Sequence, residues 1–342
     1  MTGDELERLL EQAFDAQAQA AAGEGAAPPA PRFDQARPAR RRLAMLAPIA
    51  GAAAVIAVVV LVLALTRSPS GQHKDSAQRP GAVAVHLTLG NHDGAVYGVG
   101  MPVIASFSKK ITDARALQAA TKVSVNGKTV DGAWFFEASA AGHGPVEGHL
   151  RMQDYWPAHA HVHVAIAAKG VAAGTGMAFG NSVSLDFRTG ARTVSVVDDA
   201  THRMSVTSDG KQIGTFPVSL GARNTPTASG TKVVMGMGAS ICMRGPGYHE
   251  CGVKYTQRLT YGGEYLHAAP WNMVNIVRGV DSSNGCTNLL PADAKQLYQL
   301  ARVGDVVQYP NASGRPMTMG GGYGDWNVPW RVWQRGGLAP TR

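Results

Sequence analysis

Residues 261–288 read YGGEYLHAAPWNMVNIVRGVDSSNGCTN and contain a histidine and a cysteine that together suit nucleophilic chemistry. His267 falls on an expected strand, and Cys286 follows a loop rich in Gly, Ser and Asn. A thiol attacks only as a thiolate, and its free pKa of about 8.5 leaves little thiolate at neutral pH. A nearby imidazole can take the proton, and Gly285 lets the backbone aim successive N–H groups at a developing oxyanion. The stretch predicts a Cys–His acyl-transfer site, and a structural cysteine beside an unrelated histidine is the alternative.

Three segments resemble the YkuD-type L,D-transpeptidases. In that family a histidine is followed, after a variable spacer, by [ST]-H-G-C, one further residue and [NR]. Here His267 is followed by the spacer 268–282 and then by SNGCTN at 283–288. The segment YLHAAPW at 265–271 is similar to the family's Y-x-H-[SA]-A-P-W, and GDWNVPW at 324–330 is similar to the tail of its actinobacterial branch. The resemblance extends from about residue 83 to the C-terminus.

The resemblance implies a role for each site residue. Cys286 would be the nucleophile and His267 its base, with the backbone carbonyl of Ala268 orienting the imidazole. The other residues it implies are the lid and oxyanion residue Tyr248, the pocket wall Trp271, and the loop residues Ser283, Asn284, Gly285 and Asn288. An exposed loop position for Tyr248 and core packing for Trp271 are the alternatives.

One position departs from the family pattern. The family usually has a second histidine before the Gly-Cys pair, and this chain has Asn284. If that histidine shapes the loop, the Asn284 amide can replace it by hydrogen bonding. If it tunes the thiol, the chain is a wall-binding module without activity. Because His267 is present, we expect a working enzyme.

The implied reaction joins peptidoglycan stem peptides. Cys286 would form a thioester with a tetrapeptide donor, and a diaminopimelate amine of a second stem would then form a 3→3 cross-link. The resemblance implies no metal or organic cofactor, and it implies inhibition by carbapenem β-lactams. Water as acceptor would make the chain an L,D-carboxypeptidase, and a protein amine would make it a wall-anchoring transpeptidase.

The chain has three cysteines, two of which bracket a short loop. Cys242 and Cys251 flank Gly245-Pro246-Gly247, and outside the membrane such a pair can persist as a disulfide. Their pairing would leave Cys286 as the odd thiol. A redox role for Cys242 and Cys251 fits poorly because a C-x-x-C pattern is absent from the sequence.

Composition favours globular domains. The chain has 342 residues, 45% of them hydrophobic and 16% charged, with a formal net charge of +8. That charge is compatible with nucleic acid, but aromatic residues are few and no nucleic-acid motif occurs, so no nucleic-acid partner is expected. Part of the positive charge lies in one arginine cluster, which is expected on the cytoplasmic side of a membrane anchor.

A membrane anchor is expected near the N-terminus. Arg37 and Arg40–Arg42 precede 24 uncharged residues, Leu43–Thr66. At about 1.5 Å per residue this run spans about 36 Å, enough for a bilayer core of about 30 Å. The arginines place the segment 1–42 in the cytoplasm and the catalytic part outside it. Residues 1–42 begin with a short amphipathic helix, with or without a partner, and 67–82 would be a linker.

Residues 83–190 have the texture of an antiparallel sandwich. Short alternating runs such as Val83–Leu89 and Lys122–Val125 are separated by turns, including the hairpin signal Asn126-Gly127. The segment YWPA at 155–158 resembles a corner of the family's immunoglobulin-like domain. His159, His161 and His163 alternate, so they are expected on one strand face, as a solvent-facing row or a metal site.

Residues 191–310 are expected to form the catalytic domain, and residues 311–342 a tail that packs on both domains. Strands are expected at Thr193–Val197 and Met204–Thr207, and a helix at Asp293–Ala301. The expected fold class is mainly β: an immunoglobulin-like sandwich, then a β-rich YkuD-type domain, preceded by one transmembrane helix.

Overall fold

The computed structural model describes residues 81–140, 142–245 and 248–342, all within one compact unit, His73–Arg342. The expected cytoplasmic segment 1–42, the expected membrane helix 43–66 and nearly all of the linker 67–82 lie outside the described residues. Across the ranges that are described, no helix is both long and apolar enough to span a membrane.

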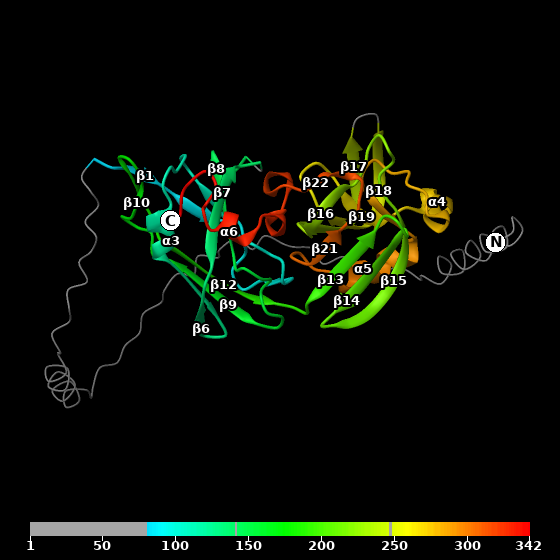
Figure 1. The fold of residues 1–342 in the computed structure, drawn as a ribbon, viewed down its shortest axis with the longest axis horizontal. Helices are drawn as coiled ribbons and strands as arrows, with labels where there is room; N and C mark the ends of the chain where they lie inside the picture. The colour runs from blue at the N-terminus through cyan, green and yellow to red at the C-terminus, as the bar shows by residue number, and fades with distance from the viewer. Residues whose placement is uncertain (1–80, 141, 246–247) are drawn as a thin grey trace, which may run out of the picture. The chain divides into compact units, whose positions relative to one another are not determined.

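The N-terminal half of the described chain consists of short strands in three sheets (Figure 1). The four-stranded sheet has the order β2 (Leu87–Leu89), β4 (Val103–Phe107), β8 (Val146–Arg151) and β7 (Ala133–Ala138). The five-stranded sheet has the order β3 (Val96–Tyr97), β12 (Val183–Thr189), β9 (His161–Ile166), β5 (Thr121–Val125) and β6 (Lys128–Val130). The small sheet has the order β1 (Val83–Val85), β11 (Met177–Phe179) and β10 (Ala172–Gly174).

Alternation along the strands produces one core shared by these sheets. Val103, Ala105 and Phe107 of β4 and Val162 and Val164 of β9 are buried in the same cluster. The β5–β6 hairpin turns at the dipeptide that the sequence predicts, and both of its residues have positive φ (Asn126 49°, Gly127 76°). This conformation matches the strand twist, as expected of a two-residue hairpin.

Two expectations for this half need correction. The run Val83–Leu89 is not one strand, because it breaks at His86 and its two parts, β1 and β2, join different sheets. His159 does not share a strand with His161 and His163: it lies in a turn with φ 53°, and its Nε2 is 2.7 Å from an oxygen of Asp209. Alternation in sequence could not reveal that turn.

The histidine row also has acidic partners that are distant in sequence. On β9, both His161 and His163 lie near Oδ1 of Asp186, at 3.1 and 3.0 Å. Asp186 is on the neighbouring strand β12, in register with His163. The two histidines thus contact one carboxylate at the surface, on the neighbouring strand.

The C-terminal half is built on one ten-stranded sheet. Its order is β17 (Gly236–Gly245), β18 (Tyr248–Arg258), β19 (Tyr265–Ala268), β20 (Thr287–Leu289), β15 (Lys211–Ser219), β14 (Arg203–Ser208), β13 (Thr193–Asp198), β21 (Val306–Tyr309), β16 (Ala228–Val233) and β22 (Gly314–Pro316). Strands β13 and β14 include the two runs expected from sequence. The core of this half includes Val197, Phe216, Leu266 and Leu289.

Helices are few and short in the described chain. They are α3 (Arg115–Ala120), η1 (Pro270–Asn272), α4 (Met273–Arg278), α5 (Pro291–Leu300), η2 (Met319–Gly321), η3 (Asp325–Asn327) and α6 (Trp330–Trp333). Helix α5 confirms the expected helix after the nucleophile loop. Helix α4 was not expected; Gly279, with φ 64°, ends it in the left-handed conformation that glycine favours.

The C-terminal tail is joined to β8 by buried polar contacts. His149 lies between Glu147 and Asp325, at 3.0 and 2.7 Å from their carboxylate oxygens. Arg151 donates to the Val328 carbonyl at 2.7 Å, and its guanidinium lies 4.3 Å from the centre of the Trp333 ring.

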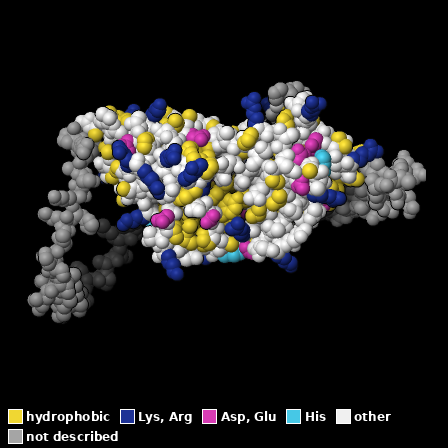
Figure 2. Space-filling model, in the orientation of Figure 1, with side chains coloured by type: hydrophobic (Ala, Val, Ile, Leu, Met, Phe, Trp, Pro, Cys, Tyr) yellow, Lys and Arg dark blue, Asp and Glu magenta, His cyan; other side chains and the backbone are white. Residues whose placement is uncertain are grey.

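On the face drawn in Figure 2, the Lys and Arg side chains of the described residues are scattered among uncharged ones.

Candidate active site

Strand pairing brings the histidine and the nucleophile loop together. Strands β19 and β20 are parallel neighbours, with His267 in register with Asn288 and Leu266 with Thr287. Cys286 is the residue before β20, so its side chain begins next to the strand that carries the imidazole. Parallel neighbours need a crossover connection, and η1 and α4 lie in it here.

The His267 imidazole is buried and held in one tautomer. Its Nδ1 donates a 2.8 Å hydrogen bond to the carbonyl of Ala268, so Nε2 carries the free lone pair. Burial lowers the pKa of His267, because water that would solvate an imidazolium is excluded, and the bond to Ala268 opposes that shift. Trp271 stacks on the ring, with centroids 5.9 Å apart. The site therefore holds a neutral imidazole ready to accept a proton.

The Cys286 thiol is also buried and neutral at rest. Burial raises its pKa to about 11, and its Sγ donates weakly to the carbonyl of Gly263 at 3.6 Å. His267 and Cys286 line the same cavity, and a neutral thiol with a neutral imidazole has the protonation states that general-base activation requires.

The nucleophile loop is fixed by its own side chains. Gly285 has φ 104°, which an L residue with a side chain rarely adopts. The Ser283 hydroxyl donates to the Cys286 carbonyl at 2.6 Å and accepts from the Gly285 N–H at 3.1 Å. Thr227 donates from its hydroxyl to the Gly285 carbonyl at 2.9 Å. These bonds set the position of the cysteine before any substrate arrives.

The segment 221–227 supports the nucleophile loop, residues 283–286. The Thr225 hydroxyl donates to the carbonyl of Ser283 at 2.9 Å. Gly221 lies so close to the nucleophile loop that a Cβ built on it would be 2.9 Å from Gly285 Cα and 2.2 Å from the Thr225 carbonyl oxygen. Only glycine allows the two loops to approach in this way.

A cavity of about 250 Å³ opens at the thiol. It is lined by Met243, Tyr248, Glu250, Val253, His267, Trp271, Asn272, Ser282, Ser283, Asn284, Cys286 and Asn288. Four of these residues come from the hairpin β17–β18, which forms one wall. Sequence reasoning missed Met243, Glu250, Val253, Asn272 and Ser282, because strand pairing, and no motif, brings them to the cavity.

The predicted site residues occupy this cavity in different ways. Trp271 is 57% exposed, which excludes core packing. Tyr248 is half-buried, and burial together with nearby Cys286 raises its pKa, so it is a protonated phenol able to donate a hydrogen bond. Asn288 is buried, and its Oδ1 has no hydrogen-bond partner in the described part of the chain. Such an atom can accept a hydrogen bond from a ligand.

Asn284 does not hold the loop by hydrogen bonding. Its side chain is exposed and faces the cavity, and it forms no hydrogen bond with residues that the structure describes. Ser283 and Thr227 do that work instead.

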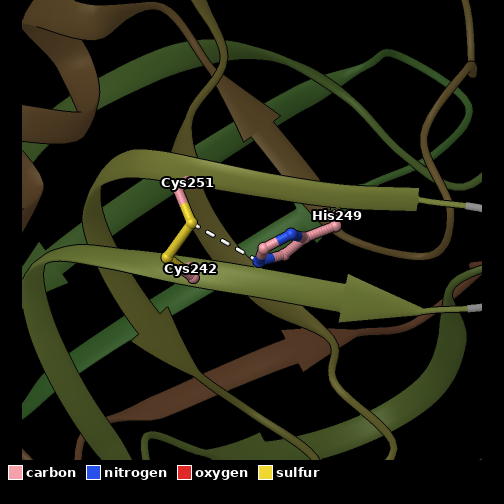
Figure 3. Close-up of side chains that lie close together, drawn as sticks. All are labelled: Cys242, His249 and Cys251. Carbon is pink, nitrogen blue, oxygen red and sulfur yellow. Dashed lines mark hydrogen bonds between the residues drawn. A yellow bond between two sulfur atoms is a disulfide. The ribbon is translucent and has the colours of Figure 1, made fainter.

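A disulfide crosses the hairpin wall (Figure 3). Cys242 on β17 is joined to Cys251 on β18, and His249 Nε2 lies 3.5 Å from Cys251 Sγ. All three residues are exposed. The disulfide links β17 to β18 near the end of the hairpin that carries Tyr248. Cys286 is the free cysteine of the chain.

Two side-chain groups in the described residues have the donor atoms of metal sites. Cys242, His249 and Cys251 form one, but the disulfide removes both thiolates that a metal would need. Asp199, His202 and Asp281 form the other, near a separate cavity of about 720 Å³ lined by Gly221 and Arg223. Neither group includes Cys286 or His267.

An ion pair between a buried lysine and a partly exposed glutamate lies near the loop that carries Cys286. Lys232 on β16 is completely buried, and its ammonium binds the carboxylate of Glu264, next to Gly263. No spacing in the sequence marks these two residues as partners.

In this β-rich domain a buried cysteine and a buried histidine line one cavity, and these are the two groups that cysteine acyl transfer uses. The comparisons with known proteins make this specific. Residues 192–308 match the L,D-transpeptidase catalytic domain family YkuD, and residues 74–172 match the bacterial Ig domain family. The chain therefore carries an L,D-transpeptidase catalytic domain of the YkuD family, preceded by a bacterial immunoglobulin domain.

Named relatives agree with this assignment. The chain is 31% identical over 253 residues to L,D-transpeptidase 2 of Mycobacterium tuberculosis, covering 71% of this chain and 60% of that protein. It is 32% identical over 247 residues to L,D-transpeptidase 5 of the same species, covering 70% and 54%. The chain thus spans little more than half the length of these curated relatives.

A solved structure agrees as well. The LD transpeptidase LdtMt1 in complex with imipenem superposes with a TM-score of 0.53 at 26% identity, covering 67% of this chain and 98% of that one.

Proposed function

We propose that this protein is a peptidoglycan L,D-transpeptidase that forms 3→3 cross-links between stem peptides through a Cys286 thioester. The observation that carries the proposal is the pairing of β19 with β20. In this pairing His267, held in one tautomer, lies beside the strand that directly follows Cys286, the free cysteine. Both side chains line a cavity that opens to solvent. The relatives named above are L,D-transpeptidases, which supports the reaction class.

In the first half-reaction, Cys286 Sγ attacks the carbonyl carbon at the L-centre of diaminopimelate in a tetrapeptide donor. His267 Nε2 takes the thiol proton as the S–C bond forms. The tetrahedral oxyanion accepts hydrogen bonds from backbone N–H groups of the loop and from the Tyr248 phenol. One such donor contributes about 3–4 kcal/mol in other enzymes. The C–N bond then breaks, and D-Ala leaves with the proton from His267.

In the second half-reaction, the side-chain amine of diaminopimelate in another stem attacks the thioester carbonyl. His267 takes a proton from that amine, the C–S bond breaks, and the thiolate recovers the proton. The unpartnered Oδ1 of Asn288 is placed to accept from an N–H group of a bound stem. Trp271 supplies an exposed ring on which the stem can pack.

The location follows from the N-terminal sequence. Leu43–Thr66 would anchor the chain as a single-pass membrane protein, with residues 1–42 in the cytoplasm and the immunoglobulin-like domain spacing the catalytic domain from the membrane. Carbapenems would acylate the same thiol, since the relative LdtMt1 was solved in complex with imipenem.

The test is product analysis by mass spectrometry. The full chain is incubated with disaccharide-tetrapeptide, beside Cys286→Ala. Cross-linked dimer that disappears in the variant is the expected result. Release of D-Ala without dimer would instead assign an L,D-carboxypeptidase. Absence of both products and of a thioester adduct would leave a wall-binding module and overturn the proposal.

A further inference from the structure

One fully buried cation in the C-terminal half, Lys232, is not used by the reaction as written. Lys232 is 0% exposed, yet it ends in an ammonium group. Its Nζ binds Oε2 of Glu264 and lies 3.9 Å from the centre of the Tyr309 ring. Burial lowers the pKa of Lys232, and the Glu264 carboxylate opposes that shift.

Glu264 connects this pair to the nucleophile. The residue before it, Gly263, has its carbonyl 3.6 Å from Cys286 Sγ. The Glu264 side chain lies along Gly285, since a Cβ built on that glycine would be 3.6 Å from Glu264 Cγ and 3.8 Å from Oε1. Oε1 also accepts from the Ala228 N–H at 2.9 Å. The carboxylate is therefore held rigidly against the loop that carries the thiol.

Lys232 reaches the other side of the nucleophile through Tyr309. The Tyr309 hydroxyl and the Thr287 hydroxyl are 2.8 Å apart, and Thr287 follows Cys286 directly. The ion pair is thus linked to the residues on both sides of Cys286: Glu264 lies against Gly285, and Lys232 contacts the Tyr309 ring, whose hydroxyl bonds Thr287.

Stability alone does not explain a buried pair in this position. Burying the Lys232 ammonium removes its charge from water, which is unfavourable, and replacing buried ion pairs with apolar residues is often neutral or stabilising. A fixed pair of charges beside a group that must ionise has a direct electrostatic effect on that group. Cys286 must become a thiolate, in a site where burial opposes any charge.

We propose that the Lys232–Glu264 ion pair positions the nucleophile loop and sets the electrostatic balance at the thiolate that forms on Cys286. This rests on the proposed function, in which Cys286 is the nucleophile. Neither residue lines the cavity at the thiol, so both are positioning residues. The two charges have opposite effects: the ammonium stabilises the thiolate and the carboxylate destabilises it.

Other groups also face the thiol and are unchanged in the test. They are His267 on β19, Tyr248 and Glu250 on the hairpin wall, and Tyr309 on β21. Among the two members of the pair, Glu264 raises the pKa of Cys286 and Lys232 lowers it, both less than burial does.

The signs of the two single variants therefore differ. Glu264→Gln removes the anion and keeps the amide shape, so the thiolate becomes easier to form. Lys232→Met removes the cation and leaves the carboxylate, so the thiolate becomes harder to form. A change of one pH unit in the pKa alters the thiolate fraction about tenfold below the pKa.

The experiment measures alkylation of Cys286 by iodoacetamide in the full chain, from pH 6 to 12 so that the profile passes through the pKa of the thiol, with the modified peptide quantified by mass spectrometry. We expect alkylation at pH 7.5 to be up to about tenfold faster in Glu264→Gln and up to about tenfold slower in Lys232→Met, with the pH profiles displaced accordingly. The double variant should lie between them. Lys211→Met, which removes an exposed lysine, changes the net charge equally and should match the parent.

Loosening of the loop gives a different pattern. If the pair were only structural, both single variants would expose Cys286, and both would be alkylated faster without displacement of the profile. That result, or unchanged profiles in folded variants, would overturn the inference. If Lys232→Met does not fold, Glu264→Gln decides alone, because a profile that is not displaced to lower pH contradicts the proposal.

The readout is independent of turnover. Alkylation needs no peptidoglycan, so failure to form cross-links would count against the proposed function while leaving the opposite displacements measurable.

Discussion

His267 Nδ1 donates a 2.8 Å hydrogen bond to the carbonyl oxygen of Ala268, the residue that follows it. This bond fixes the tautomer without a carboxylate, so Nε2 is the base and no third side chain is required. We expect His267→Gln to lower the rate of Cys286 acylation by imipenem about 10²–10⁴-fold, the usual contribution of a general base. Mass spectrometry of the adduct over time measures it.

The matched control for that variant is His92→Gln, which changes an exposed histidine in the other half. It should acylate like the parent. Acylation of His267→Gln at the parental rate would show that the thiol ionises without this imidazole.

The resting state of the pair predicts an unusual pH dependence. Burial lowers the pKa of His267 and raises that of Cys286 to about 11, so both are neutral at pH 7. Alkylation of Cys286 should therefore keep rising from neutral pH toward pH 11. A preformed thiolate–imidazolium pair would instead give a plateau near neutral pH. Alkylation rates of Cys286 measured across pH 6–10 distinguish a steady rise from a plateau.

The same pKa directions determine how these groups affect stability. The folded pKa of His267 is depressed, so its contribution is present above about pH 6.5 and lost as the pH falls. The folded pKa of Cys286 is raised, so its contribution is present below about pH 9 and lost as the pH rises toward 11. Melting temperature should decline on the alkaline side in the parent and decline less in Cys286→Ser, whose hydroxyl does not titrate there.

Asn284 and Ser283 should differ in importance despite being neighbours. The Asn284 side chain is exposed, whereas the Ser283 hydroxyl bonds both Cys286 O and Gly285 N. We expect Asn284→His to raise acylation by less than about tenfold, and Ser283→Ala to lower it about tenfold, which corresponds to roughly 1.4 kcal/mol, the size of one hydrogen bond. Kinetics with imipenem compare both with the parent; a large loss in Asn284→His would contradict the loop geometry.

The disulfide should stabilise the hairpin wall. Cys242 and Cys251 close a loop with a sequence separation of 9, for which chain entropy predicts about 2–3 kcal/mol. Native alkylation should modify neither cysteine, and reduction before alkylation should add two labels. Equal mass with and without reductant would refute the pairing. In Cys242→Ser/Cys251→Ser, proteolysis at 242–251 should be faster than in the parent.

The tail contact should be sensitive to alkaline pH. Both ring nitrogens of His149 face carboxylates, and these raise its pKa to about 10 although burial alone would lower it. The stability it contributes is therefore complete below about pH 6.5 and is lost as the pH rises through about 10. We expect Asp325→Asn to destabilise the chain by about 3 kcal/mol at pH 7, as loss of a buried partner does.

Thermal unfolding from pH 6 to 11 measures this contact. The difference between parent and Asp325→Asn should shrink as the pH rises. A constant difference would show that His149 is neutral in the folded chain.

Much of the site follows from the sequence because its chemistry lies in local segments. Cys286, Gly285 and Ser283 are neighbours in the chain, so their types and spacing already predict the thiol and the turn. The carbonyl of Ala268 as the partner of the imidazole is implied by the family resemblance, and the structure has that bond. The dipeptide Asn126-Gly127 likewise predicts its hairpin turn locally. Both residues have positive φ, a conformation that few other residue pairs favour.

Tertiary structure alone decided the contacts made across strands. Lys232 on β16 and Glu264, just before β19, meet near the loop that carries Cys286. Met243 and Val253 reach the cavity because β17 pairs with β18. His149 finds Asp325 in the same way, from 176 residues away. Local sequence determines which backbone conformations are accessible and which side chains can react. Burial and pairing of distant strands determine which charges those side chains face, and hence their protonation.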